Sequence, residues 1–336
     1  MASEIETDVA IIGAGPVGLF AVFELGMLKL SSALLDALSE VGGQCVALYP
    51  EKPIYDIPAH PAIHAGALIS HLERQITPFH APRLLGRRVT GLAGEPRAFT
   101  LTTDRGDTVR AKAVLIAAGG GAFGPNRPPL EGLAAYEASG AVQYYVRRRE
   151  DLRGKRVVIA GGGDSAVDWA LALRDVARVT VVHRRARFRA APESAAQLDA
   201  AARNGEIEMA VPYQLHALHG AGGVLRQVEV ATLQGETRLL AADVLLPFFG
   251  LSMDLGPIAA WGLESELHHV RIDPASCQTS MPGVFAIGDV ATYPGKLKLI
   301  LQGFSEAAVA AHAIFGVVHP GEALHFEYST TKGVPQ

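Results

Sequence analysis

Two glycine-rich turns hold the residues of this sequence whose types and spacing best suit chemistry. The first, Gly13-Ala14-Gly15-Pro16-Val17-Gly18, stands between an expected buried strand at 8–12 and an expected helix at 17–28. In such a unit the first glycine permits a tight turn, the second lets the backbone approach a pyrophosphate, and the third lets the helix pack against the strand. Asp36 closes the next expected strand, 32–35, where a carboxylate can bind the hydroxyls of a ribose. The pattern predicts a dinucleotide site near the N-terminus.

The second turn, Gly161-Gly162-Gly163-Asp164-Ser165-Ala166, lies between an expected strand at 157–160 and an expected helix at 165–175. Alanine is an accepted third residue of this motif. After the next expected strand, 179–183, the chain is basic and reads His183-Arg184-Arg185-Ala186-Arg187-Phe188-Arg189. Cations at this strand end favour the 2′-phosphate of NADP, whereas a carboxylate there favours the free hydroxyl of NAD; a solvated basic surface is the alternative interpretation. Two such sites predict, most simply, a bound flavin and a nicotinamide that reduces it.

A third segment, Val284-Phe285-Ala286-Ile287-Gly288-Asp289, is an apolar strand that ends in a carboxylate. Such an end can place Asp289 beside the hydroxyls of a ligand, although Gly-Asp alone is more often an ordinary turn. The helix expected to begin near Lys298 would direct its positive N-terminal end toward the same ligand.

The chain has two cysteines, Cys45 and Cys277, with no CxxC pair and no His/Cys cluster at metal-ligand spacing. This usage fits a reducing cytoplasm and predicts neither a zinc nor an iron–sulfur site. A disulfide between the two is the less favoured alternative. Without a dithiol of its own, the protein is expected to pass electrons from the flavin directly to another molecule.

Length and composition describe a protein with a large core. The 336 residues suit two domains, 49% of them are hydrophobic, 19% are charged, and the net charge is −4. That charge gives no reason to expect nucleic acid or an anionic membrane as a partner. We expect no membrane span, since no apolar run reaches the roughly 18 residues that one needs. Residues 1–8 do not resemble a signal peptide.

Strands and helices alternate along most of the chain, which predicts an α/β protein with parallel sheets and crossover helices. We expect antiparallel strands in two places, a β-meander at 83–108 and a pair at 227–233 and 237–244. A strand at 113–118, a strand at 284–287 and a long helix at 299–315 would complete the first nucleotide-binding unit. The expected fold is two Rossmann-like three-layer domains, the second inserted into the first. The FAD-binding domain would be 1–121 and 252–336, and the NADP(H)-binding domain 122–251.

Several of these segments resemble a known superfamily. The first glycine turn, residues 115–119 (LIAAG) and residues 284–289 are similar to the FAD-binding motifs of the pyridine nucleotide-disulfide oxidoreductases. The second turn with its basic segment resembles the NADPH domain of thioredoxin reductase. That enzyme carries a redox-active CxxC shortly before the turn, whereas residues 142–149 here (VQYYVRRR) contain no cysteine.

One branch is more similar still. Residues 42–52 (GGQCVALYPEK), 161–170 and 328–331 (YSTT) resemble the thioredoxin-reductase-like ferredoxin–NADP reductases, across nearly the whole chain. The resemblance implies a homodimer with non-covalent FAD. It also implies electron exchange between NADPH and ferredoxin or flavodoxin, by hydride transfer to the flavin and release of single electrons.

The resemblance also implies roles for individual residues, with no catalytic acid or base because the flavin carries the chemistry. For FAD these are Gly13, Gly15, Pro16 and Gly18 at the pyrophosphate, Asp36 at the adenosine ribose, Val89 at the adenine through its backbone, Gln44 along the flavin, Phe123 near the cofactor, Asp289 at the ribityl chain, Thr330 near the isoalloxazine, and Tyr49 and Tyr328 stacked on its two faces. For NADP they are Gly161, Gly163, Asp164, Ser165, His183, Arg184, Arg185 and Arg189.

Two other functions stay open at this point. One is a disulfide reductase that works through Cys45 or a substrate thiol, and the other is a flavin-binding regulatory protein with weak NADPH oxidase activity. An acidic carrier would need a basic surface, for which the sequence offers two candidates. One is Arg147–Arg149 with Arg153, Lys155 and Arg156, and the other is Lys296 with Lys298. Each could equally be an ordinary solvated face.

Overall fold

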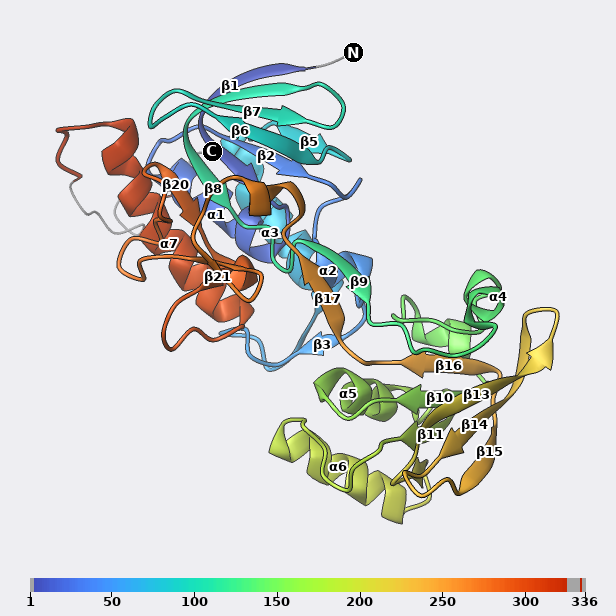
Figure 1. Cartoon of the computed structure of the whole chain (residues 1–336). Coiled ribbons are helices and arrows are strands. Elements are labelled where there is room, and N and C mark those ends of the chain that lie inside the picture. Colours follow the sequence, from blue (N-terminus) through green and yellow to red (C-terminus); the bar gives the residue numbers. More distant parts are fainter. Residues whose placement is uncertain (1–2, 325–332, 334–336) are drawn as a thin grey trace. The chain divides into compact units, whose positions relative to one another are not determined.

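The computed structural model describes residues 3–324 and 333, without the side chains of 122–123 and 251–253. The chain divides into two compact units (Figure 1). The first unit comprises Met1–Phe123 and Met253–Gln336, and the second unit is Gly124–Ser252. The second unit is thus inserted into the first, which agrees with the predicted fold class. The chain passes between them through β9 (Ala122–Pro125) and β17 (Leu251–Asp254), which pair with each other.

A parallel sheet forms the centre of the first unit. Its strands are β5 (Arg83–Leu85), β2 (Ser32–Asp36), β1 (Glu4–Ile12), β8 (Thr108–Ile116) and β20 (Val284–Ala286), in that order. Residues 9–12 of β1 and 113–116 of β8 are all buried, as strands covered on both faces require. In the register, Ile12 lies opposite both Leu35 and Ile116, so three strands end together beside the first glycine turn.

The antiparallel part of this unit differs from the predicted meander. The meander consists of β6 (Val89–Ala93), β7 (Phe99–Thr103) and the first half of β8, whereas β5 belongs to the parallel sheet beside β2. The expected separate strand at 113–118 is the second half of β8. The cause is a change of surroundings along one strand: β8 alternates between less and more buried residues beside β7, and becomes continuously buried where it pairs with β20.

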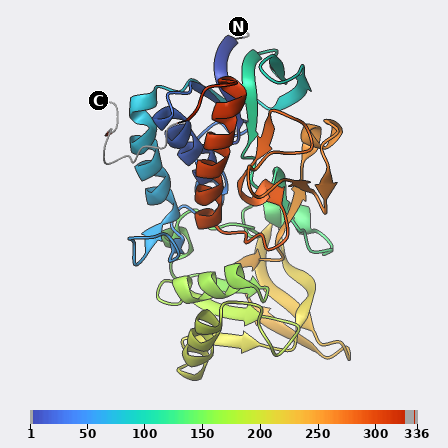
Figure 2. The same cartoon turned by 90° about the vertical axis from the view of Figure 1, so that its left-hand side faces the viewer.

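Three long helices form a layer on the parallel sheet of the first unit, with α1 (Pro16–Met27) in contact with both α3 (Ala65–Ile76) and α7 (Ile300–Val318) (Figures 1 and 2). Shorter elements complete the unit. They are α2 (Gln44–Ala47), β3 (Pro53–Ile54), β4 (Ile63–His64), β18 (Ser265–Glu266), β19 (His269–Arg271), β21 (Ala291–Thr292), and the 3₁₀ helices η1 (Thr77–Phe79), η3 (Gly256–Ala260) and η4 (Gly288–Val290).

By length and composition alone, α7 could cross a membrane, since it has 19 residues with a mean hydropathy of 1.3. The prediction that no apolar run reaches this length is therefore wrong for α7. Core helices pass the same test, and α7 is packed against α1 and η4. Its buried residues include Glu306, whose carboxylate pairs with Lys296.

The second unit has its own parallel sheet, in the order β12 (Ile207–Ala210), β11 (Arg178–Val182), β10 (Arg156–Ala160), β16 (Val244–Pro247). Helices α4 (Leu133–Ala138), α5 (Asp164–Leu173) and α6 (Pro192–Arg203), the 3₁₀ helix η2 (Arg149–Leu152), and an antiparallel sheet of β13 (Gln214–Ala221), β14 (Val224–Ala231) and β15 (Thr237–Ala241) accompany it.

The predicted strand at 237–244 is divided in the structure. Strand β15 ends at Ala241 beside β14, and Val244 begins β16 beside β10. The switch occurs over two residues, because Ala242 donates its backbone N–H to Arg226 and Asp243 donates its own to Arg156. The prediction also lacked β13, which pairs with β14.

Candidate dinucleotide-binding sites

The glycines of the first turn serve two different purposes. Gly13 has φ +113°, and a Cβ there would lie 2.3 Å from the carbonyl oxygen of Ala117. A Cβ on Gly18 would lie 1.9 Å from the carbonyl oxygen of Gly13. Both positions are therefore glycine because the turn, α1 and β8 are packed closely. A Cβ on Gly15, in contrast, would meet none of the described heavy atoms within 4 Å. Open space at this glycine is what a phosphate group that approaches the backbone needs.

The N-terminus of α1 has the features of an anion-binding site. Pro16 occupies the first turn, where a missing N–H costs nothing, and Gly15 is the N-cap residue without a side chain that could bond the helix. No acidic residue lies in the first turn. The free N–H groups and the positive end of the helix dipole therefore remain available to a ligand. This end of the first unit fits the pyrophosphate of a dinucleotide.

Asp36 lies next to this turn. One carboxylate oxygen accepts the backbone N–H of Ala14 at 2.6 Å, and the other accepts that of Leu38 at 2.8 Å. Burial raises the pKa of Asp36, and the two hydrogen bonds oppose that rise. An ionised carboxylate has about four acceptor positions, so each oxygen keeps capacity for a ribose hydroxyl. These two hydrogen bonds thus fix the orientation of the Asp36 carboxylate, the group predicted to bind the ribose.

The segment that carries the predicted flavin residues Gln44 and Tyr49 lies against the same turn. Gly42 donates its N–H to the carbonyl of Ala14 at 2.8 Å, and a Cβ on Gly43 would lie 3.1 Å from the Cα of Gly15. Gln44 begins α2 directly after these glycines. The segment that carries Gln44 and Tyr49 is therefore held at the first turn by close backbone packing.

Buried Cys45 lies close to two partly buried residues, Tyr49 and Asp289. The hydroxyl of Tyr49 donates a hydrogen bond to the sulfur of Cys45, and the charge of Asp289 acts on both. Burial raises the pKa of the Cys45 thiol to about 11, so the thiol stays protonated at neutral pH. Only a thiolate attacks a disulfide. The structure therefore gives Cys45 the properties of a packing residue, and both cysteines are free thiols.

Asp289 lies in η4, at the end of β20. Burial raises its pKa, whereas the charges of Lys296 and Lys298 lower it. Helix α7 contacts η4, and no side chain caps its N-terminus among the described residues. Val89 begins β6 and is buried, so its predicted contact with adenine would be made through the backbone. The side chain of Phe123, and both Tyr328 and Thr330, lie outside the described residues.

The second turn repeats the same division of roles. A Cβ on Gly161 would lie 2.7 Å from the carbonyl oxygen of Phe248, whereas one on Gly163 would meet no described heavy atom within 4 Å. Gly163 is the N-cap residue of α5, and Asp164 and Ser165 are exposed in the first turn of that helix. The second unit therefore also has a helix N-terminus with open space at the second glycine position of its motif, Gly163.

The basic segment, 183–189, is tied to the second turn. Arg189 donates its backbone N–H to the carbonyl of Gly162 at 2.6 Å, and Ala191 donates its own to the Asp164 carboxylate at 2.8 Å. The ring of His183 packs on Gly162, where a Cβ would come within 2.2 Å of it. Asp164 thus holds the basic segment in place, a role that the sequence did not indicate.

The positive charge of this segment comes from its arginines. Burial lowers the pKa of His183, and the charges of Arg184, Arg185 and Arg189 lower it further. His183 is therefore neutral at pH 7, so it does not add to the cations expected there. The three arginine side chains are exposed at the end of β11. Their guanidinium groups can bind the two charges of a 2′-phosphate.

Known proteins resemble the chain over its whole length. The sequence profile of the pyridine nucleotide-disulphide oxidoreductase family matches residues 7–313. A ferredoxin–NADP reductase of Acidiphilium cryptum is 75% identical over 336 residues, which cover 100% of this chain and 99% of that protein. One of Gluconacetobacter diazotrophicus is 69% identical over 335 residues, which cover 99% of this chain and 98% of that protein.

The chain belongs to the pyridine nucleotide-disulphide oxidoreductase family, among its ferredoxin–NADP reductases. The resemblance drawn from the glycine turns and residues 42–52 is thereby confirmed, and so is the assignment to the enzymes.

Solved structures of two other reductases share the fold. Thioredoxin reductase of Lactococcus lactis has a TM-score of 0.80 at 24% identity, and the match covers 93% of this chain and 99% of that one. The bacillithiol disulfide reductase of Staphylococcus aureus has a TM-score of 0.76 at 18% identity, over 93% and 99% of the two chains. At these identities the likeness concerns the fold alone.

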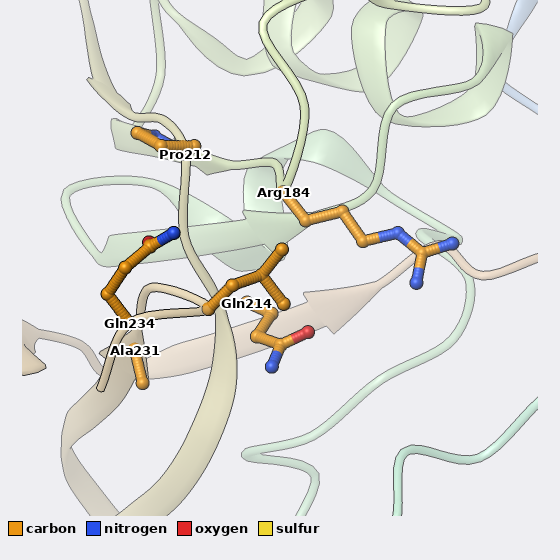
Figure 3. A pocket seen from close by; sticks show the side chains of 6 residues that line it. Arg184, Pro212, Gln214, Ala231 and Gln234 are labelled. Carbon is orange, nitrogen blue, oxygen red and sulfur yellow. The ribbon is translucent and has the colours of Figure 1, made fainter. Parts of the chain in front are cut away.

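The second unit has a pocket of about 130 Å³ at the carboxyl end of its parallel sheet (Figure 3). Arg184 lines it together with Gln214 from β13 and Gln234 from the turn after β14. Pro212, Ala231 and Leu233 complete its wall. Sequence reasoning missed these glutamines because no motif contains them, and only the path of β13 and β14 brings them to Arg184.

Several charged groups of the two predicted basic surfaces are already in contact with other side chains of the protein. The side chain of Lys296 is 5% exposed and its ammonium group pairs with Glu306, so this charge lies inside the first unit rather than on a docking face. Lys298 contacts the ring of His269 at 2.7 Å. In the arginine run, Arg149, Arg153 and Arg156 each pair with an acid, namely Asp175, Glu150 and Asp243. These pairs neutralise much of the charge expected to attract an acidic carrier.

Proposed function

We propose that this enzyme passes electrons between NADPH and a one-electron carrier, ferredoxin or flavodoxin, with FAD held by the first unit and NADP(H) by the second. The observation that carries the proposal is the pairing of two open glycine positions with opposite neighbours. Gly15 lies beside the carboxylate of Asp36. Gly163 lies beside the arginine-rich segment 183–189, which is hydrogen-bonded to the second turn. The full-length identity to ferredoxin–NADP reductases supports the same assignment.

In the first unit, the backbone around Gly15 and the N-terminus of α1 would bind the pyrophosphate of FAD, and Asp36 the adenosine ribose. Asp289 would bind the ribityl chain, and Tyr49 would exclude water from one face of the flavin. Bound FAD supplies the conversion between two-electron and one-electron transfer. The protein residues orient the cofactor and set its electrostatic surroundings, and none needs to act as an acid or base.

In the second unit, Gly163 and the N-terminus of α5 would bind the pyrophosphate of NADP(H). Arg184, Arg185 and Arg189 would bind its 2′-phosphate, and the neutral ring of His183 would pack beside it. Gln214 and Gln234 line the pocket next to Arg184 and could hydrogen-bond the adenosine portion. Because arginine forms paired hydrogen bonds to a phosphate, the segment would favour NADPH over NADH.

The alternative of a disulfide reductase is disfavoured by the thiols themselves. Cys45 is 2% exposed and Cys277 is 1% exposed, and burial raises the pKa of Cys277 to about 12. Neither can supply a thiolate at neutral pH, and the chain has no third cysteine. We further propose a cytoplasmic homodimer, an assignment that rests on the sequence resemblance and on cysteine usage alone.

The test is a set of parallel assays on the purified chain. Reduction of cytochrome c by NADPH should be slow alone and accelerate with added ferredoxin or flavodoxin, while thioredoxin and small disulfides should not be reduced. Identification of FAD in an acid extract and a lower rate with NADH should accompany this. Rapid disulfide reduction without carrier stimulation would refute the proposal, and weak NADPH oxidation that no carrier accelerates would favour a regulatory flavoprotein.

A further inference from the structure

Helix α7 packs closely against two segments of the first unit, the first glycine turn and the turn at Gly288 and Asp289. A Cβ on Gly303 would lie 2.4 Å from the side chain of Val17 and 3.4 Å from the Cα of Gly288. Val17 belongs to the first glycine turn, and Gly288 has φ +73° in η4. The first helical turn of α7 is therefore packed directly on the segments proposed to bind the pyrophosphate and the ribityl chain of FAD.

One turn further along α7, Glu306 is buried and makes three hydrogen bonds. One carboxylate oxygen accepts the backbone N–H of Gly288 at 2.8 Å. The other accepts the hydroxyl of Tyr293 at 2.7 Å and the ammonium group of Lys296. Tyr293 also accepts a hydrogen bond from Gln302 at 2.9 Å. The carboxylate thus joins α7 to both ends of the loop that carries Asp289.

Burial of this ion pair costs desolvation free energy. The side chains of Lys296 and Glu306 are each 5% exposed, and desolvation of two charges can exceed their mutual attraction. The proposed electron transfer makes no direct use of either group. What the pair does provide is a rigid acceptor for the N–H of Gly288, the residue next to Asp289.

We propose that Glu306, oriented by Lys296 and Tyr293, is a positioning residue that holds the Gly288–Asp289 turn in the conformation that retains FAD. The inference rests on the proposed binding of FAD by the first unit. Without the acceptor, the turn must either leave the N–H of Gly288 buried and unbonded or move toward water. Movement of the turn would displace Asp289 from the cofactor.

Two double variants separate hydrogen bonding from charge. Lys296→Met/Glu306→Gln removes both charges and keeps an oxygen that can accept the N–H of Gly288. Lys296→Met/Glu306→Leu removes both charges and the acceptor. Since they share the same change of charge, a difference between them reports on the acceptor alone.

The readout is the rate at which the FAD-loaded protein releases its flavin after dilution, followed by the rise in flavin fluorescence. We expect release from the Leu variant to be at least about tenfold faster than from the Gln variant, which corresponds to about 1.4 kcal/mol. Val109→Ala is the control for lost stability, because it leaves a small cavity among buried residues near the start of β8, away from every residue assigned to FAD. It should lower the unfolding midpoint and leave flavin release unchanged.

Equal release rates for the two double variants would overturn the positioning role. If the Leu variant does not fold, Tyr293→Phe serves instead, because it removes one bond to Glu306 without burying a lone charge; release should accelerate by about two- to tenfold, and an unchanged rate would overturn the proposal. If the wild-type chain binds no flavin, no release rates can be compared, and that result would refute the proposed function as well.

Discussion

Alanine at two glycines of the same turn should have opposite effects, because their surroundings differ. Gly15 has φ −71° and ψ −178°, a conformation that alanine adopts readily, and its Cβ would meet no described atom within 4 Å. Gly15→Ala should therefore leave the FAD-free protein as stable as the wild type, or more stable by about 0.4–1 kcal/mol through lost freedom of the unfolded chain. Gly18→Ala places its Cβ 1.9 Å from the Gly13 carbonyl oxygen and should destabilise the fold by about 1–3 kcal/mol or more.

The magnitude for FAD follows from what the new methyl group displaces. In Gly15→Ala it would occupy the open space where we place the pyrophosphate, and would cost about two hydrogen bonds from backbone N–H groups to a charged oxygen. At about 1.5 kcal/mol each, the loss is roughly 3 kcal/mol, or about a hundredfold in affinity. Gly163→Ala is the matched control in the second unit, since its Cβ also meets open space. It should weaken NADPH binding and leave FAD content unchanged.

Two measurements decide this prediction. The ratio of flavin absorbance to protein absorbance gives the FAD content of each purified variant, and urea unfolding of the FAD-free proteins gives their stability. We expect a stable Gly15→Ala that has lost FAD and an unstable Gly18→Ala. A Gly15→Ala that retains FAD as tightly as the wild type would refute the reasoning, since the open space would then not be the pyrophosphate site.

Three further predictions concern the second unit and the thiols. Arg184→Ala should raise the KM for NADPH by about tenfold or more, since a charged hydrogen bond contributes about 1.5–3 kcal/mol. The KM for NADH should hardly change. Equal changes in the two KM values in steady-state assays would argue against a 2′-phosphate contact. Because the folded pKa of His183 lies below its unfolded value, its contribution to stability is present above about pH 6.5 and is lost as pH falls. His183→Gln should therefore flatten the decline in unfolding midpoint between pH 7 and pH 5, and an unchanged slope would count against a neutral, partly buried ring. Cys45 and Cys277 should both resist a thiol reagent until the chain is unfolded, and rapid labelling of Cys45 in the native protein would show that its burial is misjudged.

The sequence predicted the parts of the fold that depend on local pattern. The buried runs of β1 and β10, the glycine turns and the carboxylate at the end of β2 follow from alternating strand and helix signals, and they stand where expected. Strand β8 was divided wrongly because one strand passes from an alternating to a fully buried environment. That change depends on which strands lie beside it, and sequence pattern does not contain this information.

The candidate sites show the same limit. Asp164 stays a predicted contact of NADP, and its carboxylate also accepts the backbone N–H of Ala191, a bond that no motif indicates. The spacing of Lys296 and Lys298 indicated a surface, yet Lys296 is buried because Glu306, ten residues later, meets it across the fold. Tertiary contacts of this kind decide whether a charge serves a ligand, a partner or the protein itself.

An anaerobic titration of the FAD-loaded chain with NADPH tests the central claim most directly. If electrons pass from NADPH to FAD and leave for a carrier without a protein dithiol, one equivalent of NADPH per flavin should bleach the flavin absorbance completely. Added oxidised ferredoxin or flavodoxin should then restore it. Uptake of a second equivalent of NADPH would reveal another redox centre, and a flavin that NADPH cannot bleach would contradict the account altogether.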